Sequence, residues 1–107
     1  MAVVNEEIAR KMLGDVPEDK QFYCFDGRVL KNLSELWLAL TEMSDETFSY
    51  HSNDTKADFS NWVKDVIGDE KLPLDLQKSG NRVRAAKAVS DRIAWLRTKI
   101  PASRRPK

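Results

Sequence analysis

The sequence predicts an all-α fold, a compact bundle of five or six short helices with a small β-hairpin near the N-terminus. Apolar residues recur at steps of three and four in several segments, which is the spacing of one helix face. All four glycines fall between these segments, and three of them precede Asp or Asn, as expected where one helix stops and the next begins. At 107 residues the chain has the length of one domain. We expect a single helical domain over residues 1–100 and a disordered basic tail over 101–107.

The N-terminal third begins with a helix and continues into the hairpin. Apolar side chains recur every fourth position from Val4, which predicts a helix over about residues 3–13. Residues 22–30 place Asp26-Gly27 between aromatic and β-branched residues, and this pattern predicts two short strands joined by a type I′ turn. Because an isolated hairpin is only marginally stable in water, we expect it to pack on the helices.

Capping residues divide the middle of the chain into two helices. Asn32 precedes an apolar helical pattern and has Glu35 three residues later, which resembles a capping box. The sequence therefore predicts an amphipathic helix over residues 33–43. Ser44 is predicted to cap a second, shorter helix that ends at about His51.

Three further helices are expected in the second half of the chain. Asp54 is predicted to cap a helix that ends before Gly68. A short helix follows with Pro73 in its first turn, where the missing N–H is tolerated. Asn81 then caps a long helix over about residues 82–100. The apolar steps of this helix also permit a coiled-coil seam with a second copy, but about two heptads are too few for a sustained one.

These helical faces predict a single core, and the composition excludes some classes of protein. The longest apolar run spans five residues, whereas a transmembrane helix needs about 20, so we expect no membrane span. The lone Cys24 cannot form an internal disulfide and the N-terminus does not resemble a secretory signal, so we expect a cytoplasmic protein. The predicted core contains Ile8, Leu33, Leu36, Trp37, Leu40, Phe48, Phe59, Trp62, Val63, Val66, Val89, Ile93 and Leu96.

A series of spaced residues between Phe22 and about Leu76 carries a resemblance to a known family. The matching positions are Phe22, Tyr23, residues 26–33 (DGRVLKNL), Glu35, Leu36, residues 43–48 (MSDETF), His51, Asn53, Lys56, Asp58, Phe59, Trp62, Val63, Val66, Gly68, Asp69 and Leu72. Their pattern resembles an uncharacterised domain family of archaeal and bacterial proteins, from which Ala57 and Pro73 depart. The resemblance implies a compact, mostly helical domain. It implies no catalytic residue, because the family has no established activity.

Few residues are candidates for catalysis. His51, Asp54 and Asp58 are spaced so that they would meet a metal ion, but one histidine with N-cap aspartates is a poor ligand set. We expect His51 instead to pack at a helix junction with its second ring nitrogen hydrogen-bonded. Cys24 with His51 would make a nucleophile–base pair, yet a cysteine within an aromatic strand is more typical of a small buried apolar residue. The sequence contains no phosphate-binding loop, zinc-protease motif or serine-hydrolase motif, so we expect no cofactor and no metal.

Charge is distributed unevenly along the chain, although the net charge is only +1. Residues 1–79 hold 9 basic and 16 acidic residues, whereas residues 80–107 hold 9 basic residues and 1 acidic residue. We interpret the acidic pair Asp69-Glu70 as caps and solvated charge at a helix start, not as an acid–base pair. The basic C-terminal quarter would bind phosphates or an acidic protein surface, or it would dock on the acidic remainder of its own fold.

Trp95 differs from the other two tryptophans in its place on the predicted helix. At about 100° per residue, it lies nearly opposite the mean direction of the apolar side chains of the last helix. Its neighbours one turn away include Asp91, Arg92 and Lys99. Such a tryptophan is covered by the N-terminal helix or the hairpin, covered by a partner, or exposed for stacking.

The leading hypothesis is a non-enzymatic, adaptor-like protein-interaction domain that uses the basic C-terminal helix around Trp95. Nucleic-acid binding through the same helix and tail is the alternative, and a small metal-dependent enzyme is the third reading. We expect a monomer in preference to a homodimer, an unidentified protein partner and no membrane association. The side chains expected to bind the partner are Arg84, Arg92, Trp95, Lys99, Arg104 and Arg105.

Overall fold

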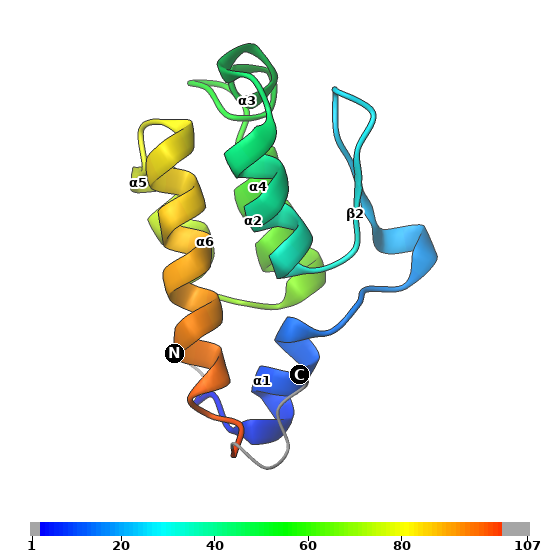
Figure 1. Ribbon diagram of the computed structural model, residues 1–107, viewed down its shortest axis with the longest axis vertical. Helices are drawn as coiled ribbons and strands as arrows, with labels where there is room; N and C mark the ends of the chain where they lie inside the picture. Colours follow the sequence, from blue (N-terminus) through cyan, green and yellow to red (C-terminus); the bar gives the residue numbers. More distant parts are fainter. Residues whose placement is uncertain (1–2, 102–107) are drawn as a thin grey trace.

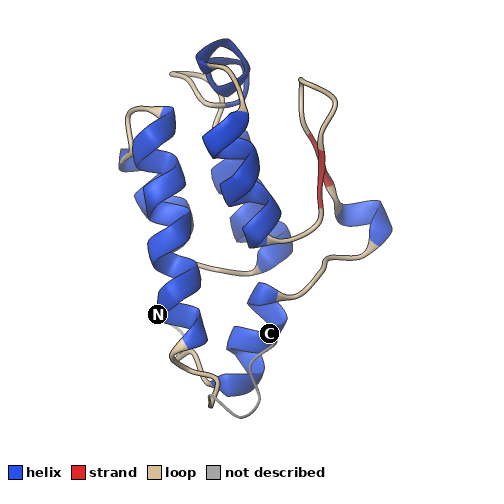
Figure 2. Ribbon diagram, viewed as in Figure 1, coloured by secondary structure: helices blue, strands red, loops and turns tan. Residues whose placement is uncertain are grey.

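Helices α2 (Leu33–Glu42) and α6 (Arg82–Arg97) run side by side in the computed structural model, which describes residues 3–101. Figure 1 shows this pair along the long axis of the molecule. Helix α1 (Glu6–Leu13) contacts both of them. Figure 2 shows the hairpin on the side of α2 away from α6. The α2–α6 pair is therefore the element on which the rest of the fold is arranged.

The remaining helices are short. Helix α3 (Asp45–His51) follows α2 after a two-residue connection, and α4 (Asp58–Trp62) continues directly as the π-helical segment η2 (Val63–Ile67). Helix α5 (Leu72–Lys78) packs on both α4 and α6. The predicted fold class is confirmed, because residues 3–101 contain six α-helices and one two-stranded antiparallel sheet near the N-terminus.

The hairpin supplies two side chains to the core. A 3₁₀ turn, η1 (Glu18–Lys20), leads into strands β1 (Phe22–Tyr23) and β2 (Val29–Leu30), which pair antiparallel. Phe22 lies opposite Leu30 in this register, and both are buried. Because successive strand residues point to opposite faces, the other pair of the ladder is exposed.

The turn of the hairpin differs from the prediction. A type I′ turn needs positive φ at both central residues. Gly27 has φ of 95°, but no residue other than glycine has positive φ in the described chain, so Asp26 does not meet this requirement. The Gly27 N–H donates to the Cys24 carbonyl, and the Cys24 N–H donates to the Arg28 carbonyl. These bonds close a three-residue loop that ends in a left-handed glycine, so the type I′ prediction is wrong.

Helix starts follow the predicted capping residues at most positions. The side chains of Asn32, Ser44 and Asn81 each accept a hydrogen bond from the backbone N–H three residues later, as predicted. Asn5 does the same for α1, which therefore begins after Asn5 and not near residue 3. Gly68 ends η2 with φ of 85°, a conformation that glycine adopts without strain.

The predicted cap at Asp54 is wrong. Asn53, one residue earlier, accepts hydrogen bonds from two backbone N–H groups beyond it and closes a tight turn. The chain then stays non-helical through Ala57, and α4 begins at Asp58 without a side-chain cap. Because Asn53 closes a turn at this point, no helix begins directly after Asp54, and its side chain has no helix N-terminus to cap.

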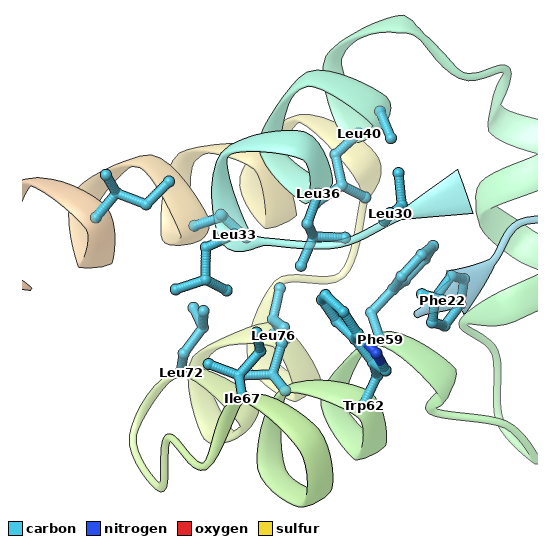
Figure 3. Close-up of a cluster of buried hydrophobic side chains, with 14 of the residues drawn as sticks. Phe22, Leu30, Leu33, Leu36, Leu40, Phe59, Trp62, Ile67, Leu72 and Leu76 are labelled. Carbon is cyan, nitrogen blue, oxygen red and sulfur yellow. The ribbon is translucent and has the colours of Figure 1, made fainter. Parts of the chain in front are cut away.

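Buried side chains from the hairpin and the helices form one core. Figure 3 shows Phe22 and Leu30 pointing toward Phe59 and Trp62 of α4, with the leucines of α2 completing the cluster. Of the thirteen predicted core residues, nine are buried. Three more are partly buried and pack against the core: Ile8, Phe48 and Val66.

Trp37 is the remaining predicted core residue, and the prediction is wrong because 39% of its surface is exposed. The buried face of α2 is centred on Leu36, with Leu33 and Leu40 on either side of the same stripe. As the next residue along the helix, Trp37 is turned by about 100° from Leu36, at the border of that face. It lines a shallow groove beside α6 that also contains Arg97.

Candidate functional site

Trp95 lies in a groove on the surface of α6, and 40% of its surface is exposed. The groove has a volume of about 700 Å³ and lies between α6, the start of α5 and the N-terminal segment. We call this surface the Trp95 groove, and it is defined by Arg84, Ala88, Trp95, Lys99, Val3 and Val4.

The N-terminal segment covers Trp95 only in part. Figure 1 shows this segment beside the C-terminal half of α6, and Val4 is partly buried there while Val3 is 84% exposed. The predicted coiled-coil stripe of α6 points the other way, into the interior of the same chain. Its buried members are Ala86, Val89, Ile93, Leu96 and Ile100. Helix α6 itself ends at Arg97, before the predicted end near residue 100.

Arg92, one of the predicted partner-binding residues, lies in the interior beside Trp95. Its Nε donates to Oδ2 of Asp69 at 2.7 Å and its Nη2 donates to Oδ1 at 3.0 Å. Asp69 is fully buried and Arg92 is 9% exposed, so the prediction that Asp69 is solvated is wrong. Its carboxylate does accept the backbone N–H groups of Lys71 and Leu72 at the start of α5, as expected of a cap. The guanidinium takes the place of water around this carboxylate. Its Cζ also lies 4.3 Å from the centre of the Trp95 ring, so Arg92 supports the ring from inside.

The groove carries an excess of positive charge. Five cationic and two acidic side chains line it. Arg84 and Lys99 have no carboxylate partner among residues 3–101, and the Lys99 Nζ lies 4.6 Å from the centre of the Trp95 ring. Two other cations are neutralised across one helical turn: Lys71 by Asp75, and Lys87 by Asp91. Arg84 and Lys99 are therefore the charges with the least compensation in the groove.

Two further basic residues of the C-terminal quarter, Arg82 and Arg97, do not line this groove. Arg82 donates hydrogen bonds to the start of α3 and to backbone carbonyls at the end of α2. Arg97 lines the separate groove beside Trp37. Arg104 and Arg105, with the rest of the expected disordered tail from residue 102 on, lie outside the described residues. Three of the six predicted partner-binding residues therefore line the groove and are available to a partner. Trp95 contributes an aromatic ring, and Arg84 and Lys99 each contribute a positive charge that no carboxylate of residues 3–101 neutralises.

His51 is buried between the hairpin, α3 and α4, as predicted. Its Nε2 accepts a hydrogen bond from the Phe25 N–H at 2.9 Å, and its Nδ1 lies 2.9 Å from a carboxylate oxygen of Asp58. Because Nε2 accepts, Nδ1 carries the proton and donates it to Asp58. Asp54 takes no part in these hydrogen bonds. Within residues 3–101, no three His, Cys, Asp or Glu side chains gather as ligands for a metal ion.

Cys24 is buried in the hairpin, as predicted. Burial raises the pKa of the Cys24 thiol, so the nucleophilic thiolate is disfavoured. Burial also disfavours the ionised form of the neighbouring Asp26 carboxyl. Hydrogen bonds from the Arg28 backbone N–H and from the side chains of Cys24 and Arg28 outweigh this effect of burial, so the pKa of Asp26 is lowered. Both ring nitrogens of His51 are engaged elsewhere, so His51 does not pair with Cys24 as its base.

An exposed aromatic cluster at the hairpin tip was missed in the sequence analysis. The rings of Phe25 and Tyr50 stack with their centres 4.2 Å apart, and the Nζ of Lys56 lies 4.0 Å from the centre of the Tyr50 ring. Tyr23 is also exposed on the hairpin. Strand alternation was the available signal, because it directs Tyr23 and Phe25 away from the buried side of Phe22.

Comparison with known proteins finds no family model, no curated protein and no solved structure that matches this chain. The resemblance seen between Phe22 and Leu76 therefore stays a prediction. None of the helices formed by residues 3–101 combines the length and the apolar character needed to cross a membrane.

Proposed function

We propose that this protein is a non-enzymatic interaction domain that binds a partner protein through the Trp95 groove. The observation that carries the proposal is a half-exposed tryptophan that shares one groove with Arg84 and Lys99, two cations without a carboxylate partner in the described chain. Tryptophan and arginine are the residue types most enriched where interfaces concentrate their binding energy. Helix α6 and the Asp69–Arg92 pair hold the floor of the groove in place, so that binding would require little ordering of the protein.

Nucleic-acid binding through the same surface is the second candidate. The net charge of residues 80–107 favours nucleic-acid binding, because this part of the sequence contains 9 basic residues and only 1 acidic residue. The arrangement of these charges favours it less, since Arg82, Lys87 and Arg92 each form an ion pair with a carboxylate of the fold. Two carboxylates also line the groove and would repel a phosphate backbone.

We place the protein in the cytoplasm and propose that it is a monomer. The free thiol of Cys24 suits a reducing compartment. The apolar stripe of α6 packs within its own chain, so a second copy would have to bind through another surface.

Single tryptophan replacements test the proposed function. Trp95→Ala should abolish the capture of specific proteins from an extract of the source cells, measured by quantitative mass spectrometry after nuclease treatment. Trp37→Ala is the matched control, because it removes an indole of nearly equal exposure (39% against 40%) from a different groove. Both variants should keep the wild-type circular dichroism spectrum. Identical sets of captured proteins for the wild type and Trp95→Ala would overturn the proposal.

A salt titration tests the second candidate. Nucleic-acid binding predicts that the affinity for a labelled random-sequence duplex or single strand falls steeply as salt rises, because bound counterions are released. Fluorescence anisotropy at low and near-physiological salt measures this dependence. Micromolar, salt-sensitive binding would favour nucleic acid over a protein partner, whereas no binding at low salt would exclude it.

A further inference from the structure

We infer that the Trp95 groove binds an acidic amphipathic helix presented by the partner protein. This inference rests on the proposed function and adds the chemistry of the partner to it. Three features of the groove point to such an occupant: a floor along one helix, the apolar side chains of Ala88, Trp95 and Val4, and cations without carboxylate partners at both ends.

The floor of the groove follows one face of α6. Arg84, Ala88, Trp95 and Lys99 are separated by four, seven and four residues, which places them in one stripe. At about 1.5 Å per residue, the helical part of the stripe, from Arg84 to the end of α6, is about 20 Å long and matches a helix of about 13 residues laid along it. The backbone groups of α6 are used within the helix itself, so the floor offers no free strand edge to an extended peptide.

The centre of the stripe contains the apolar side chains of Ala88 and Trp95, with the ion-paired Asp91 one turn from each of them. Ala88 and Trp95 lie two helical turns apart, and Val4 adds an aliphatic side chain at the border. A small side chain at Ala88 allows a second helix to come close, while the large indole of Trp95 provides area for contact. The occupant therefore needs apolar side chains that recur at helical spacing on one face.

The ends of the stripe call for negative charge. Arg84 lies in the first turn of α6 and Lys99 lies two residues beyond its last turn, and neither pairs with a carboxylate in residues 3–101. Asp or Glu side chains near both ends of the bound helix would neutralise them. A basic helix would meet the uncompensated charges of Arg84 and Lys99 and be repelled.

The same details favour a peptide over a nucleic acid. A base that stacks on Trp95 would have to displace the Lys99 Nζ, which lies 4.6 Å from the ring centre. Asp75 and Asp91 also line the groove. A peptide helix can set neutral side chains opposite these carboxylates, whereas every unit of a phosphate backbone carries a charge.

Selection from random peptides tests the inference without a known partner. A phage-displayed library of random peptides of about 16 residues is selected on the immobilised full chain and counter-selected on Trp95→Ala. The expected result is enrichment of peptides in which Asp and Glu outnumber Lys and Arg and apolar residues recur at helical spacing. The synthetic peptides should gain helical circular dichroism on binding. Enrichment of neutral or basic peptides, or no enrichment that depends on Trp95, would overturn the inference.

Charge reversal on α6 provides the matched comparison. Arg84→Glu combined with Lys99→Glu should weaken the best acidic peptide at least about tenfold in fluorescence anisotropy. Arg97→Glu is the control, because it reverses a charge of the same helix in the other groove, and it should change the affinity less than about twofold. Losses in binding free energy in the ratio of the charges reversed, two against one, would show that only the net charge matters, which contradicts a defined helix site. A single-stranded oligonucleotide that binds more tightly than every selected peptide would also overturn the inference.

Different experimental results would contradict the acidic-helix inference and the proposed interaction function. If proteins are captured through Trp95 but the selected peptides are not acidic, the acidic helix is wrong and the interaction domain stands. If neither protein capture nor peptide binding depends on Trp95, the proposed function is wrong as well.

Discussion

Asp69 and Arg92 form a buried ion pair beneath Trp95 that joins the start of α5 to the middle of α6. The Arg92 Nε lies 2.7 Å from the Asp69 carboxylate, whose Oδ1 also accepts the Lys71 N–H at 2.9 Å. The same guanidinium lies 4.3 Å from the centre of the Trp95 ring. One side chain therefore neutralises a carboxylate that has no access to water and supports the exposed ring of the groove.

Breaking this pair should destabilise the fold strongly. Arg92→Met leaves the Asp69 carboxylate buried without a positively charged partner, and Asp69→Asn leaves the guanidinium without a negatively charged one. We expect each variant to lower the free energy of unfolding by about 3–5 kcal/mol, measured by urea denaturation. The double variant should lose clearly less than the two single losses combined, because no unpaired charge is left behind.

An exposed pair on the same helix provides the control for this cycle. The side chains of Lys87 and Asp91 are 74% and 65% exposed. Lys87→Met and Asp91→Asn should each change the free energy of unfolding by less than about 1 kcal/mol. Strictly additive losses at Asp69 and Arg92 would show that the buried pair is not an energetic unit.

The two tryptophans predicted to be buried should differ in their contribution to stability. Trp62 is 7% exposed and donates its Nε1–H to the Lys20 carbonyl at 2.8 Å. Trp62→Ala should therefore cost about 3–5 kcal/mol of unfolding free energy. Trp37→Ala should cost less than about 1 kcal/mol, because the side chain borders the surface. Equal losses in urea denaturation would show that Trp37 is buried in solution.

Sequence patterns predicted the local features of this fold well. Caps at Asn32, Ser44 and Asn81 were found because the capping hydrogen bond joins residues three positions apart. Asp54 has the same chemistry, but Asn53 beside it closes a turn first. Periodicity also placed Trp95 off the buried face of its helix, where the structure has it half-exposed.

Burial that depends on distant parts of the chain was not predictable in this way. Arg92 is enclosed because Asp69, 23 residues earlier, accepts its two hydrogen bonds, and no local pattern links the two positions. The exposure of Trp37 depends on how α6 lies against α2, which helical spacing does not specify. The same holds for the groove beside Trp95, since its border comes from Val3 and Val4 at the other end of the chain.

His51 should hold the hairpin tip to the helices. His51→Leu removes the acceptor of the Phe25 N–H and the donor to Asp58, so we expect a loss of about 1–3 kcal/mol and faster amide exchange at Phe25. His51→Gln keeps an acceptor at a similar reach and should restore part of the protection. The Cys24 amide, which bonds within the hairpin, is the internal control in the NMR exchange measurement. Unchanged exchange at Phe25 in His51→Leu would contradict the hydrogen bond.

The stability of the protein should depend on the ionisation of Cys24 at alkaline pH. Burial raises the pKa of this thiol above its ordinary value, so the folded chain binds the proton more tightly than the unfolded chain. The stabilisation is complete below the pKa of the unfolded thiol and is lost as the pH rises through the higher pKa of the folded state. The free energy of unfolding should therefore fall from about pH 9 upward.

Cys24→Ala separates this effect from the titration of lysines and tyrosines in the same range. The wild type should lose stability more steeply than Cys24→Ala above about pH 9. Iodoacetamide, which reacts with the thiolate, should modify the folded chain much more slowly than the urea-unfolded chain at the same pH. Equal rates in the two states would mean that the thiol is accessible in the folded protein. Parallel stability curves would mean that its pKa is the same in both states, because only a difference in bound protons changes the slope.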